Sequence, residues 1–456
     1  MIHLAAMLGA LGWLVAHHVV TVFVAVVTAG LSAAVLGQRR PTGSAYAWLL
    51  VLLFIPYLGI PLYVVFGGRK FARRARSKTP LTTEATGIAP GIAAESHAET
   101  VLWLDDGVLA YETFLSQIKN AKRSIRLVTF VVGNDPTGRS LIEALIERAS
   151  AGVEVCLLID DFLRIHAPKQ LLKKLEASGG RVRRFMPLFH VPFRGRGNLR
   201  NHRKIALFDG ERAIVGGMNL AEEYLGPTPS PTRWRDLSTL VSGDVVGPLD
   251  AIFRADWEHA AGVALEPQIK VAASVSGAHA APVRVVPSGP DAPNDAIYDA
   301  LLTAIFRAES RVWIATPYFI PDEPLTRALA IAARHGIDVR VFVPAESNHT
   351  VADLVAGPSL RELAGEGVEV LRYRGMLHAK TILVDESIAV VGSANFDMRS
   401  LFLDYEVALF FSGLPEVTRL ARWFEATLAS CDSGAPVAGW VRTRVELVAR
   451  LLAPLL

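Results

Sequence analysis

Two long apolar stretches open the chain, and they contain almost no charge. The first covers residues 4–36 and the second covers 45–66, which is interrupted by Pro56 and Pro61. Because about 20 apolar residues can span the hydrocarbon core of a bilayer, residues 1–67 predict a two-segment membrane anchor. The prolines leave open whether the second segment is a full span or a kinked or re-entrant one.

Positive charge flanks these apolar stretches unequally. Arg39 and Arg40 lie between them, whereas six basic residues follow within 69–78. By the positive-inside rule, we expect the N-terminus and the chain beyond the anchor to lie in the cytoplasm. Residues 68–100 begin as this basic stretch and continue with many Thr, Ala, Gly and Pro residues, which indicates a flexible linker.

The rest of the chain shows the same order of elements twice. A strand over 124–130 precedes a helix and a second strand within 143–160, and the strand over 310–319 precedes the same pair within 327–344. Each second strand is a continuous apolar run, as expected for a sheet covered on both faces. We therefore predict an α/β body made of two similar halves. The predicted domains are the anchor 1–67, the linker 68–100, a first half 101–260, a linker 261–282, a second half 283–430 and a C-terminal amphipathic helix 431–456.

Composition limits the class of protein. Of the 456 residues, 51% are hydrophobic and 20% are charged, which excludes a disordered or collagen-like chain. Cys156 and Cys431 are too few for a disulfide framework or a cysteine metal site, and they fit a reducing compartment. The net charge of +3 is close to neutral and indicates no partner by itself.

Both halves contain the pattern H-x-K-x4-D, in "NHRKIALFDGERAIVGGMN" and in "LHAKTILVDESIAVVGSAN". In both copies an Asn follows 17 residues after the His. Because His and Lys are two positions apart on a strand, their side chains leave by the same face. One copy is a weak signal, whereas two copies with the same downstream Asn indicate a site. The residues are His202, Lys204, Asp209 and Asn219 in the first half and His378, Lys380, Asp385 and Asn395 in the second.

These side chains suit attack on a phosphodiester. Two Lys and two Asn side chains supply the positive charge and the donors that its non-bridging oxygens require. One neutral imidazole can act as nucleophile, and the other can donate a proton to the leaving group and then act as base. The motifs are not accompanied by a cluster with metal-ligand spacing, so neither a metal nor another cofactor is expected.

Each imidazole also needs a partner on its far nitrogen. Asp236 in "WRDLSTLV" and Glu406 in "LDYEVALFF" are the candidates on the next apolar strand of each half, the alternative being exposed strand carboxylates. We expect Asp209 and Asp385 to brace their motifs by local hydrogen bonds.

Aromatic and basic residues near the motifs predict the mouth of the site. Trp234 and Arg235 stand beside Asp236, and Tyr318 and Phe319 follow a strand. Trp234 and Arg235 are predicted to contact substrate, with a core or rim position as the alternative for each residue.

Taken together, the motifs resemble those of the phospholipase D superfamily, and the chain is similar to membrane-anchored bacterial cardiolipin synthases. The resemblance covers nearly the whole chain and rests on "AYAWLLVLLFIPYLGIPLYVVFGGRK", "NHRKIALFDG", "GGMNLAEEYLG", "WRDL", "ATPYFIPD", "LHAKTILVD" and "GSANFDMRSLFLDYE". It implies two phospholipase D-like half-domains related by pseudo-twofold symmetry, with both motifs in one cleft.

The resemblance also implies an activity and a location. The activity is metal-independent transfer of a phosphatidyl group between two phosphatidylglycerol molecules with release of glycerol, and the location is the inner (cytoplasmic) membrane. In the family pattern His202 is the nucleophile and His378 the acid and base, which sequence symmetry alone does not decide. The family usually has Asn at the position of Asp404.

The substrate class requires a separate argument, because the superfamily also contains nucleases. Residues 181–204 hold eight basic and no acidic side chains, interleaved with three Phe. Such a stretch suits single-stranded nucleic acid, the surface of an anionic bilayer or a solvated loop. The anchor favours phosphatidylglycerol and other anionic phospholipids as partners over nucleic acid. Residues 437–456 fit either an interfacial helix or one packed on the body, and the oligomeric state is not indicated.

Two other functions remain open from the sequence. One is a phospholipase or nuclease of the same superfamily with water as the acceptor. The other is a non-catalytic scaffold that binds anionic lipid, although such a scaffold would not need two complete motifs.

Overall fold

The computed structural model describes residues 2–37, 42–66, 95–162, 167–186, 199–268, 280–292 and 294–450. The chain divides into two compact units, one of Met1–Phe71 with Phe189–Asn198 and one of Ala72–Leu188 with Leu199–Leu456. Most of the predicted linker 68–100 and the middle of the linker 261–282 lie outside the described residues.

The first unit contains the two apolar stretches. They form α1 (Ile2–Leu36), α2 (Thr42–Phe54) and α3 (Pro56–Phe66). Within the described residues, α1 alone is long and apolar enough to cross a membrane, over Gly12–Leu36. The second stretch is divided at Ile55 because Pro56 lacks an N–H group to continue the helix.

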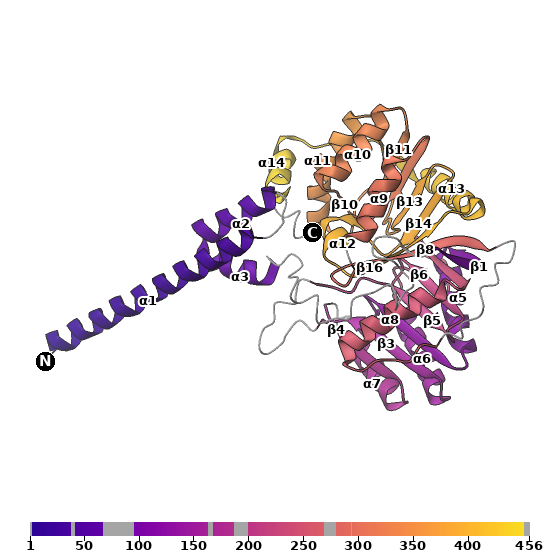
Figure 1. Ribbon diagram of the computed structural model, residues 1–456, viewed down its shortest axis with the longest axis horizontal. Helices are drawn as coiled ribbons and strands as arrows, with labels where there is room; N and C mark the ends of the chain where they lie inside the picture. The colour runs from indigo at the N-terminus through magenta and orange to yellow at the C-terminus, as the bar shows by residue number, and fades with distance from the viewer. Residues whose placement is uncertain are drawn as a thin grey trace. The chain divides into compact units, whose positions relative to one another are not determined.

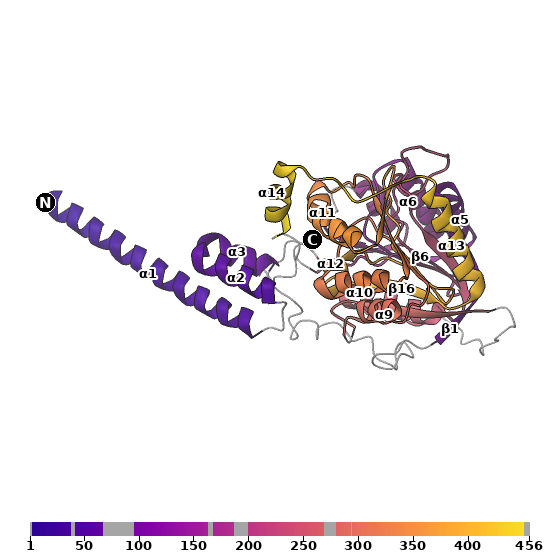
Figure 2. The ribbon, with the colours of Figure 1, turned by 90° about the horizontal axis from the view of Figure 1, so that it is seen from above.

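The second unit is built of α/β elements, and its arrangement is visible in Figures 1 and 2. The elements up to residue 261 are β1 (Glu95–Leu104), α5 (Gly107–Asn120), β2 (Ser124–Thr129), α6 (Pro136–Ser150), β3 (Glu154–Asp160), α7 (Lys169–Ala177), β4 (Arg181–Phe185), β5 (Ile205–Phe208), β6 (Arg212–Gly216), β7 (Ser238–Gly243) and α8 (Val246–Ala261). The elements after residue 280 are β8 (Ala281–Ser288), α9 (Ala296–Phe306), β9 (Arg311–Ala315), β10 (Phe319–Ile320), α10 (Glu323–Arg334), β11 (Asp338–Pro344), α11 (Thr350–Gly365), β12 (Glu369–Tyr373), β13 (Thr381–Val384), β14 (Ile388–Gly392), β15 (Phe396–Asp397), α12 (Met398–Phe402), β16 (Glu406–Phe411), α13 (Leu414–Leu428), β17 (Cys431–Ser433) and α14 (Trp440–Ala449).

The two halves share one 15-stranded sheet. Its order is β17-β12-β11-β9-β13-β14-β16-β8-β1-β7-β6-β5-β2-β3-β4. From the antiparallel β8–β1 pair outward, the strand order of one half mirrors that of the other, with β17 added at one edge. This arrangement confirms the predicted α/β fold with two similar halves.

The predicted strand–helix–strand units are present in both halves. The first is β2, α6 and β3, and the second is β9, α10 and β11. Gly152 and Gly336 follow the two helices, and both have a φ of 85°, a left-handed conformation that glycine adopts without steric cost. The first half begins earlier than the predicted residue 101, because Glu95–Ala98 already pair with β8.

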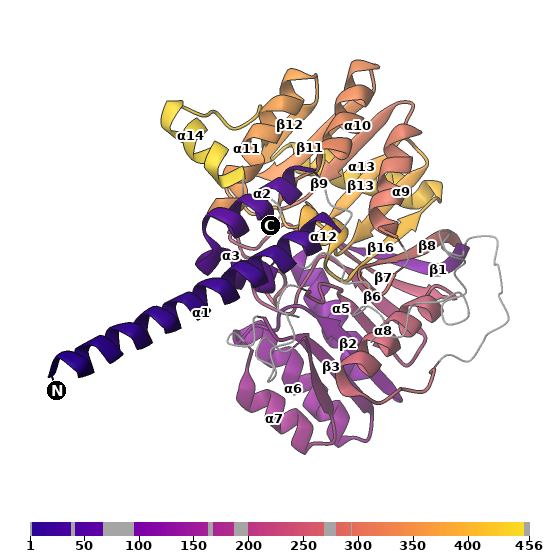
Figure 3. The same cartoon turned by 60° about the vertical axis from the view of Figure 1, so that its left-hand side comes forward.

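The core of this unit has three parts, and Figure 3 shows the helices that cover them. Apolar residues of α5, α6 and α7 pack on one face of the first half, and those of α9, α10 and α11 pack on one face of the second. A third core joins the halves, with Val215 of β6, Val391 of β14, Trp257 of α8 and Phe424 of α13 among its members. The two halves therefore fold as one body.

A buried arginine in the first motif crosses between the halves. The Nε atom of Arg203 donates to the carbonyl oxygen of Glu406 at 3.0 Å, and Nη2 donates to that of Ser288 at 3.1 Å. Nη1 lies 2.7 Å from Oδ1 of Asp256, and both terminal nitrogens lie 3.1 Å from Asp291. All five N–H groups of this guanidinium are thus satisfied.

Replacing this arginine should destabilise the whole body. Arg203→Ala removes the positive charge that pairs with two buried carboxylates, so we expect the free energy of unfolding to fall by about 3–5 kcal/mol. Denaturant unfolding of the detergent-solubilised chain measures this loss. The matched control is Arg327→Ala, whose ion pair with Glu323 is largely exposed and should contribute less than about 1 kcal/mol. Equal losses in the two variants would contradict the assigned role of Arg203.

Candidate active site

Each motif lies on the stretch that leads into a central strand. His202 and Lys204 precede β5, and His378 and Lys380 precede β13. His378 and both Lys residues are buried, and the side chain of His202 is 14% exposed. The alternation predicted from the sequence holds, because the intervening Arg203 points away into the contacts described above.

The backbone of each motif pairs with the opposite half. The N–H of His202 donates to the carbonyl oxygen of Tyr405 at 2.9 Å, directly before β16. The N–H of His378 donates to the carbonyl oxygen of Arg235 at 2.8 Å, shortly before β7. These two contacts determine which carboxylate each imidazole meets.

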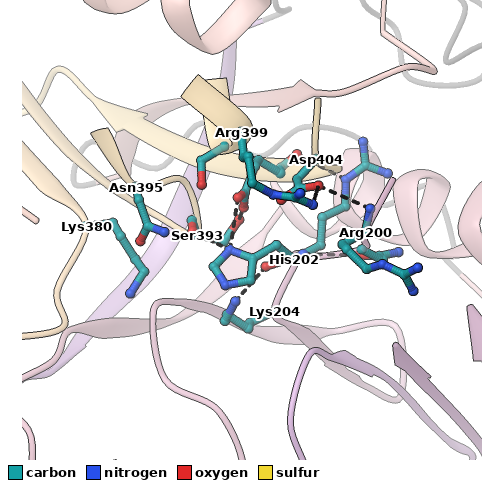
Figure 4. A network of polar contacts seen from close by, with 12 residues as sticks. Arg200, His202, Lys204, Lys380, Ser393, Asn395, Arg399 and Asp404 are labelled. Carbon is teal, nitrogen blue, oxygen red and sulfur yellow. Dashed lines mark hydrogen bonds and ion pairs between the residues drawn. The ribbon is translucent and has the colours of Figure 1, made fainter. Parts of the chain in front are cut away.

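The carboxylate partners are therefore exchanged between the halves. Nδ1 of His202 lies 2.9 Å from Oε1 of Glu406, and Nδ1 of His378 lies 2.7 Å from Oδ2 of Asp236. The sequence reasoning selected both acids but assigned one to each half by strand order. The pairing across the halves corrects that assignment, and it brings both motifs together in one place. Figure 4 shows Lys380 and Asn395 of the second half beside the ring of His202.

The hydrogen bonds of His202 define its tautomer. Its Nδ1 faces two acceptors, the Glu406 carboxylate and the carbonyl oxygen of Ser393 at 3.0 Å. Nδ1 must therefore carry the hydrogen, which leaves the lone pair of the neutral ring on Nε2. In His378, Nδ1 faces both the Asp236 carboxylate at 2.7 Å and the Nζ of Lys380 at 2.6 Å, so these contacts do not select one tautomer.

Burial disfavours the protonated form of the histidines and lysines in this site. It lowers the pKa of both imidazoles, although Glu406 and Asp236 oppose that shift. Burial also lowers the pKa of Lys204 to about 7 and that of Lys380 to about 8. Both imidazoles are therefore neutral at neutral pH, and both lysines are close to their titration range.

The two motif aspartates are structural in this fold. Asp209 accepts hydrogen bonds from the backbone N–H groups of residues 122–124, and Asp385 accepts from those of 309–311. Burial alone would raise the pKa of each carboxyl, but the backbone donors outweigh it and hold the pKa below its ordinary value. Each aspartate therefore anchors the start of β2 or β9, as the predicted bracing role requires.

The two motif asparagines lie close to the site but are held by protein groups. Oδ1 of Asn219 accepts from the N–H of Val131 at 3.2 Å. Nδ2 of Asn395 donates to Oδ2 of Asp397 at 3.0 Å, and burial raises the pKa of that carboxyl to about 7. Their role as donors to a phosphate stays a prediction.

Aromatic rings enclose the two imidazoles. The ring of Phe130 lies 5.0 Å from that of His202, and the rings of Tyr224 and Trp234 lie 4.9 Å and 5.3 Å from that of His378. Trp234 thus lies beside His378, and its contact with substrate stays a prediction. Tyr224 and Phe130 were missed, because neither belongs to the repeated H-x-K-x4-D pattern with its downstream Asn.

Arg235 does not lie as the sequence suggested. Its Nε donates to the hydroxyl of Thr427 at 2.7 Å, and its guanidinium stacks on Trp423 of α13 at 4.9 Å. Because successive residues of an extended strand point to opposite faces, Asp236 faces the imidazole and Arg235 faces α13. This placement does not support the predicted contact with substrate.

Further polar residues support His202, and sequence reasoning did not select them as site residues. The hydroxyl of Ser393 donates to Oε2 of Glu406. Oδ1 of Asp404 accepts from the backbone N–H of Arg200 at 3.1 Å and from Nη2 of Arg399 at 3.2 Å. An asparagine could accept both bonds through its Oδ1, so Asp404 preserves the contacts and adds a charge, while burial raises its pKa.

The predicted basic surface is only partly described. Residues 187–198 lie outside the described residues. At its start, the guanidinium groups of Arg181 and Arg183 lie 5.8 Å and 6.0 Å from the ring of Trp257. Within the described part of the chain, no group of three or more His, Cys, Asp or Glu residues is placed to hold a metal ion.

Removing the Ser393 hydroxyl should weaken the fold in a pH-dependent way. The serine lowers the pKa of Glu406, and a hydrogen bond to a charged group contributes about 1.5–3 kcal/mol. A lowered carboxyl pKa stabilises the fold above the ordinary pKa, and this stabilisation is lost as the pH falls through the folded-state value. At neutral pH, we therefore expect Ser393→Ala to lower the free energy of unfolding by this amount. Below about pH 4, the difference from the unsubstituted protein should become smaller.

Denaturant unfolding at several pH values measures this difference. Ser387→Ala is the matched control, because that hydroxyl bonds only a turn carbonyl at 3.4 Å. A loss in Ser393→Ala that stays the same at every pH would contradict the proposed coupling to Glu406.

Family models match both units of the chain. The model described as cardiolipin synthase, phospholipase D-like domain matches residues 114–257 and 301–428, which together exceed half of the chain. The model described as phospholipase D-nuclease N-terminal matches residues 19–68.

Individual relatives agree with these matches. A cardiolipin synthase of Clostridium perfringens (strain SM101 / Type A) is 32% identical over 413 residues, which cover 82% of this chain and 85% of the relative. The major cardiolipin synthase ClsA of Bacillus subtilis (strain 168) is 32% identical over 458 residues, covering 92% and 95%.

A solved structure supports the fold. The phosphatidylserine synthase of Haemophilus influenzae Rd KW20 has a TM-score of 0.61 and 15% identity, covering 84% of this chain and 98% of that chain. At this identity the likeness concerns the fold alone. Both motifs lie in one site, and the family model and the relatives match most of the chain. The chain therefore belongs to the cardiolipin synthase, phospholipase D-like family.

Proposed function

We propose that this protein transfers a phosphatidyl group from one phosphatidylglycerol to another, giving cardiolipin and glycerol through a phospho-histidine intermediate. The observation that carries the proposal is the exchange of carboxylates, which holds two imidazoles from different halves in one site. Relatives called cardiolipin synthases support the choice of reaction.

The first displacement forms a bond from phosphorus to Nε2 of His202. The bond between phosphorus and the glycerol oxygen breaks, and protonated His378 gives its proton to that oxygen. Lys204 and Lys380 provide positive charge for the non-bridging oxygens. The two acceptors on Nδ1 of His202 stabilise the positive ring that forms, which supports His202 as the nucleophile.

The second displacement reverses these roles. A hydroxyl of the second phosphatidylglycerol gives its proton to His378, and its oxygen attacks phosphorus as the bond to Nε2 of His202 breaks. Aromatic rings on both imidazoles support an alcohol as the acceptor, because they limit access of water; Tyr224 is buried, and Phe130 and Trp234 are half-buried. In this proposal no metal ion or cofactor takes part.

The proposed location is the inner membrane of a bacterium, with a multi-pass anchor and the body on the cytoplasmic side. The helix α1 and the excess of basic residues after the anchor support it. Anionic phospholipids are the proposed partners, and no nucleic acid is expected.

Products from a single lipid test the reaction. Purified full-length protein given phosphatidylglycerol labelled in the phosphatidyl group and in the headgroup should release cardiolipin and glycerol in equal amounts. His202→Ala should abolish turnover, whereas His335→Ala, an exposed histidine at the end of α10, should leave the rate unchanged. Phosphatidic acid as the main product indicates a hydrolase, cleavage of a DNA oligonucleotide indicates a nuclease, and the absence of turnover indicates a scaffold.

The role of each imidazole can be separated with an activated substrate. A phosphatidyl ester of p-nitrophenol needs no general acid, because its leaving group is stable as an anion. His378→Ala should release about one equivalent of nitrophenolate per protein and retain the phosphatidyl label on His202. His202→Ala should show no burst. A burst in His202→Ala with the label on His378 would reverse the assignment.

A further inference from the structure

The C-terminal helix α14 is attached to the body through a charged residue. It packs against α11, and its Glu446 is fully buried. The carboxylate of Glu446 pairs with Arg361 of α11 and with Arg442 at 2.8 Å. Ala449 is the other buried residue of this helix.

The opposite face of α14 is apolar. Trp440, Val441, Leu447 and Val448 are spaced to share one side of a helix, and they are 75%, 66%, 56% and 69% exposed. An ordinary surface helix has the reverse arrangement, with its apolar residues toward the core. We call these four residues the outward face.

The exposed charges of α14 are positive. Glu446 is its one acidic residue, and it is buried and paired. Arg444 lies within the outward face, with its guanidinium 5.4 Å from the ring of Trp440, and Arg450 is also exposed. An apolar surface with arginines and a tryptophan matches the boundary between headgroups and acyl chains of an anionic bilayer.

From this arrangement we infer that α14 is a membrane-docking helix, whose outward face inserts into the interface of an anionic bilayer. A second copy of the chain is a poorer occupant. A stable protein interface needs about 20–30 residues on each side, whereas the outward face offers four apolar side chains with an arginine among them. A bilayer imposes no such minimum.

The position of α14 relates this docking to the site. The helix α11 contacts β10, and β10 pairs with β15, which begins directly after Asn395. A pocket lined by Tyr318, Arg372, Pro436 and Arg442 lies between these elements and α14. Docking through the outward face therefore brings the end of the second half that carries Asn395 close to lipid.

A fluorescent probe on α14 tests the inference without depending on the reaction. Full-length protein carrying Cys431→Ser and Val448→Cys is labelled with nitrobenzoxadiazole, because Cys156 is buried. It is reconstituted into phosphatidylcholine vesicles with or without phosphatidylserine, and with a phospholipid spin-labelled near its headgroup as quencher. The matched control carries the probe at Lys173→Cys, an exposed position on α7.

Docking predicts a blue-shifted emission at position 448 that the spin-labelled lipid quenches, more strongly with phosphatidylserine, and no such change at position 173. Adding Trp440→Ser and Val441→Ser should reduce the quenching while Glu446 still holds the helix. Replacing Arg444 by Gln should weaken docking about fivefold in anionic vesicles. Probe emission typical of an aqueous environment in every vesicle would overturn the inference. An emission change that depends on the number of protein molecules per vesicle, and not on the lipid composition, would also overturn it.

Activity gives a second readout. Trp440→Ser with Val441→Ser should lower the rate on lipid in vesicles and leave the rate on water-soluble, short-chain phosphatidylglycerol unchanged. Equal losses on both substrates would contradict docking. If the unsubstituted protein turns over neither substrate, the proposed reaction is refuted, while the probe result still decides whether α14 docks.

Discussion

The arrangement of the site depends on the alternation of side chains from His202 to Lys204. In an extended segment the outer two residues point to one side and Arg203 points to the other. On its side, the guanidinium binds α8, the end of β8 and the backbone of Glu406. The same three residues thus present the reactive groups and hold the halves together. The second motif has Ala379 at this position, packed in the core between the halves, so one arginine serves both.

These contacts between the halves also explain why each imidazole meets the carboxylate of the other half. Once the first motif lies along the residues before β16, its imidazole is next to Glu406, and the residues before β7 meet the second motif in the same way. Neither half contains a complete site by itself. An imidazole that kept only the partners of its own half would lack the carboxylate that fixes its tautomer.

Much of this could be predicted from local patterns. The repeated units, the two motifs and both orienting acids follow from periodicity and spacing, which are visible within short windows. The exchange of Asp236 and Glu406 could not, because it depends on backbone contacts between distant parts of the chain, such as the one between His202 and Tyr405. Arg235 was misplaced for the same reason, since its neighbour α13 follows much later in the chain. Ser393 and Tyr224 were missed because neither position is shared by the two motifs.

The two half-sites are similar but not equal, and the difference has an electrostatic consequence. His202 has a glutamate, a serine hydroxyl behind it and a carbonyl oxygen, whereas His378 has an aspartate packed against Gly217 and the Lys380 ammonium beside both ring nitrogens. The site holds two carboxylates, Asp236 and Glu406, beside two lysines whose pKa burial lowers. A phosphodiester anion adds one negative charge, which favours the uptake of a proton. Because His202 retains the better-stabilised Nδ1 hydrogen, its Nε2 lone pair is best directed at phosphorus. In the proposed reaction His378 is the acid, and the negative charge of the phosphodiester opposes the effect of burial, which lowers the pKa of His378.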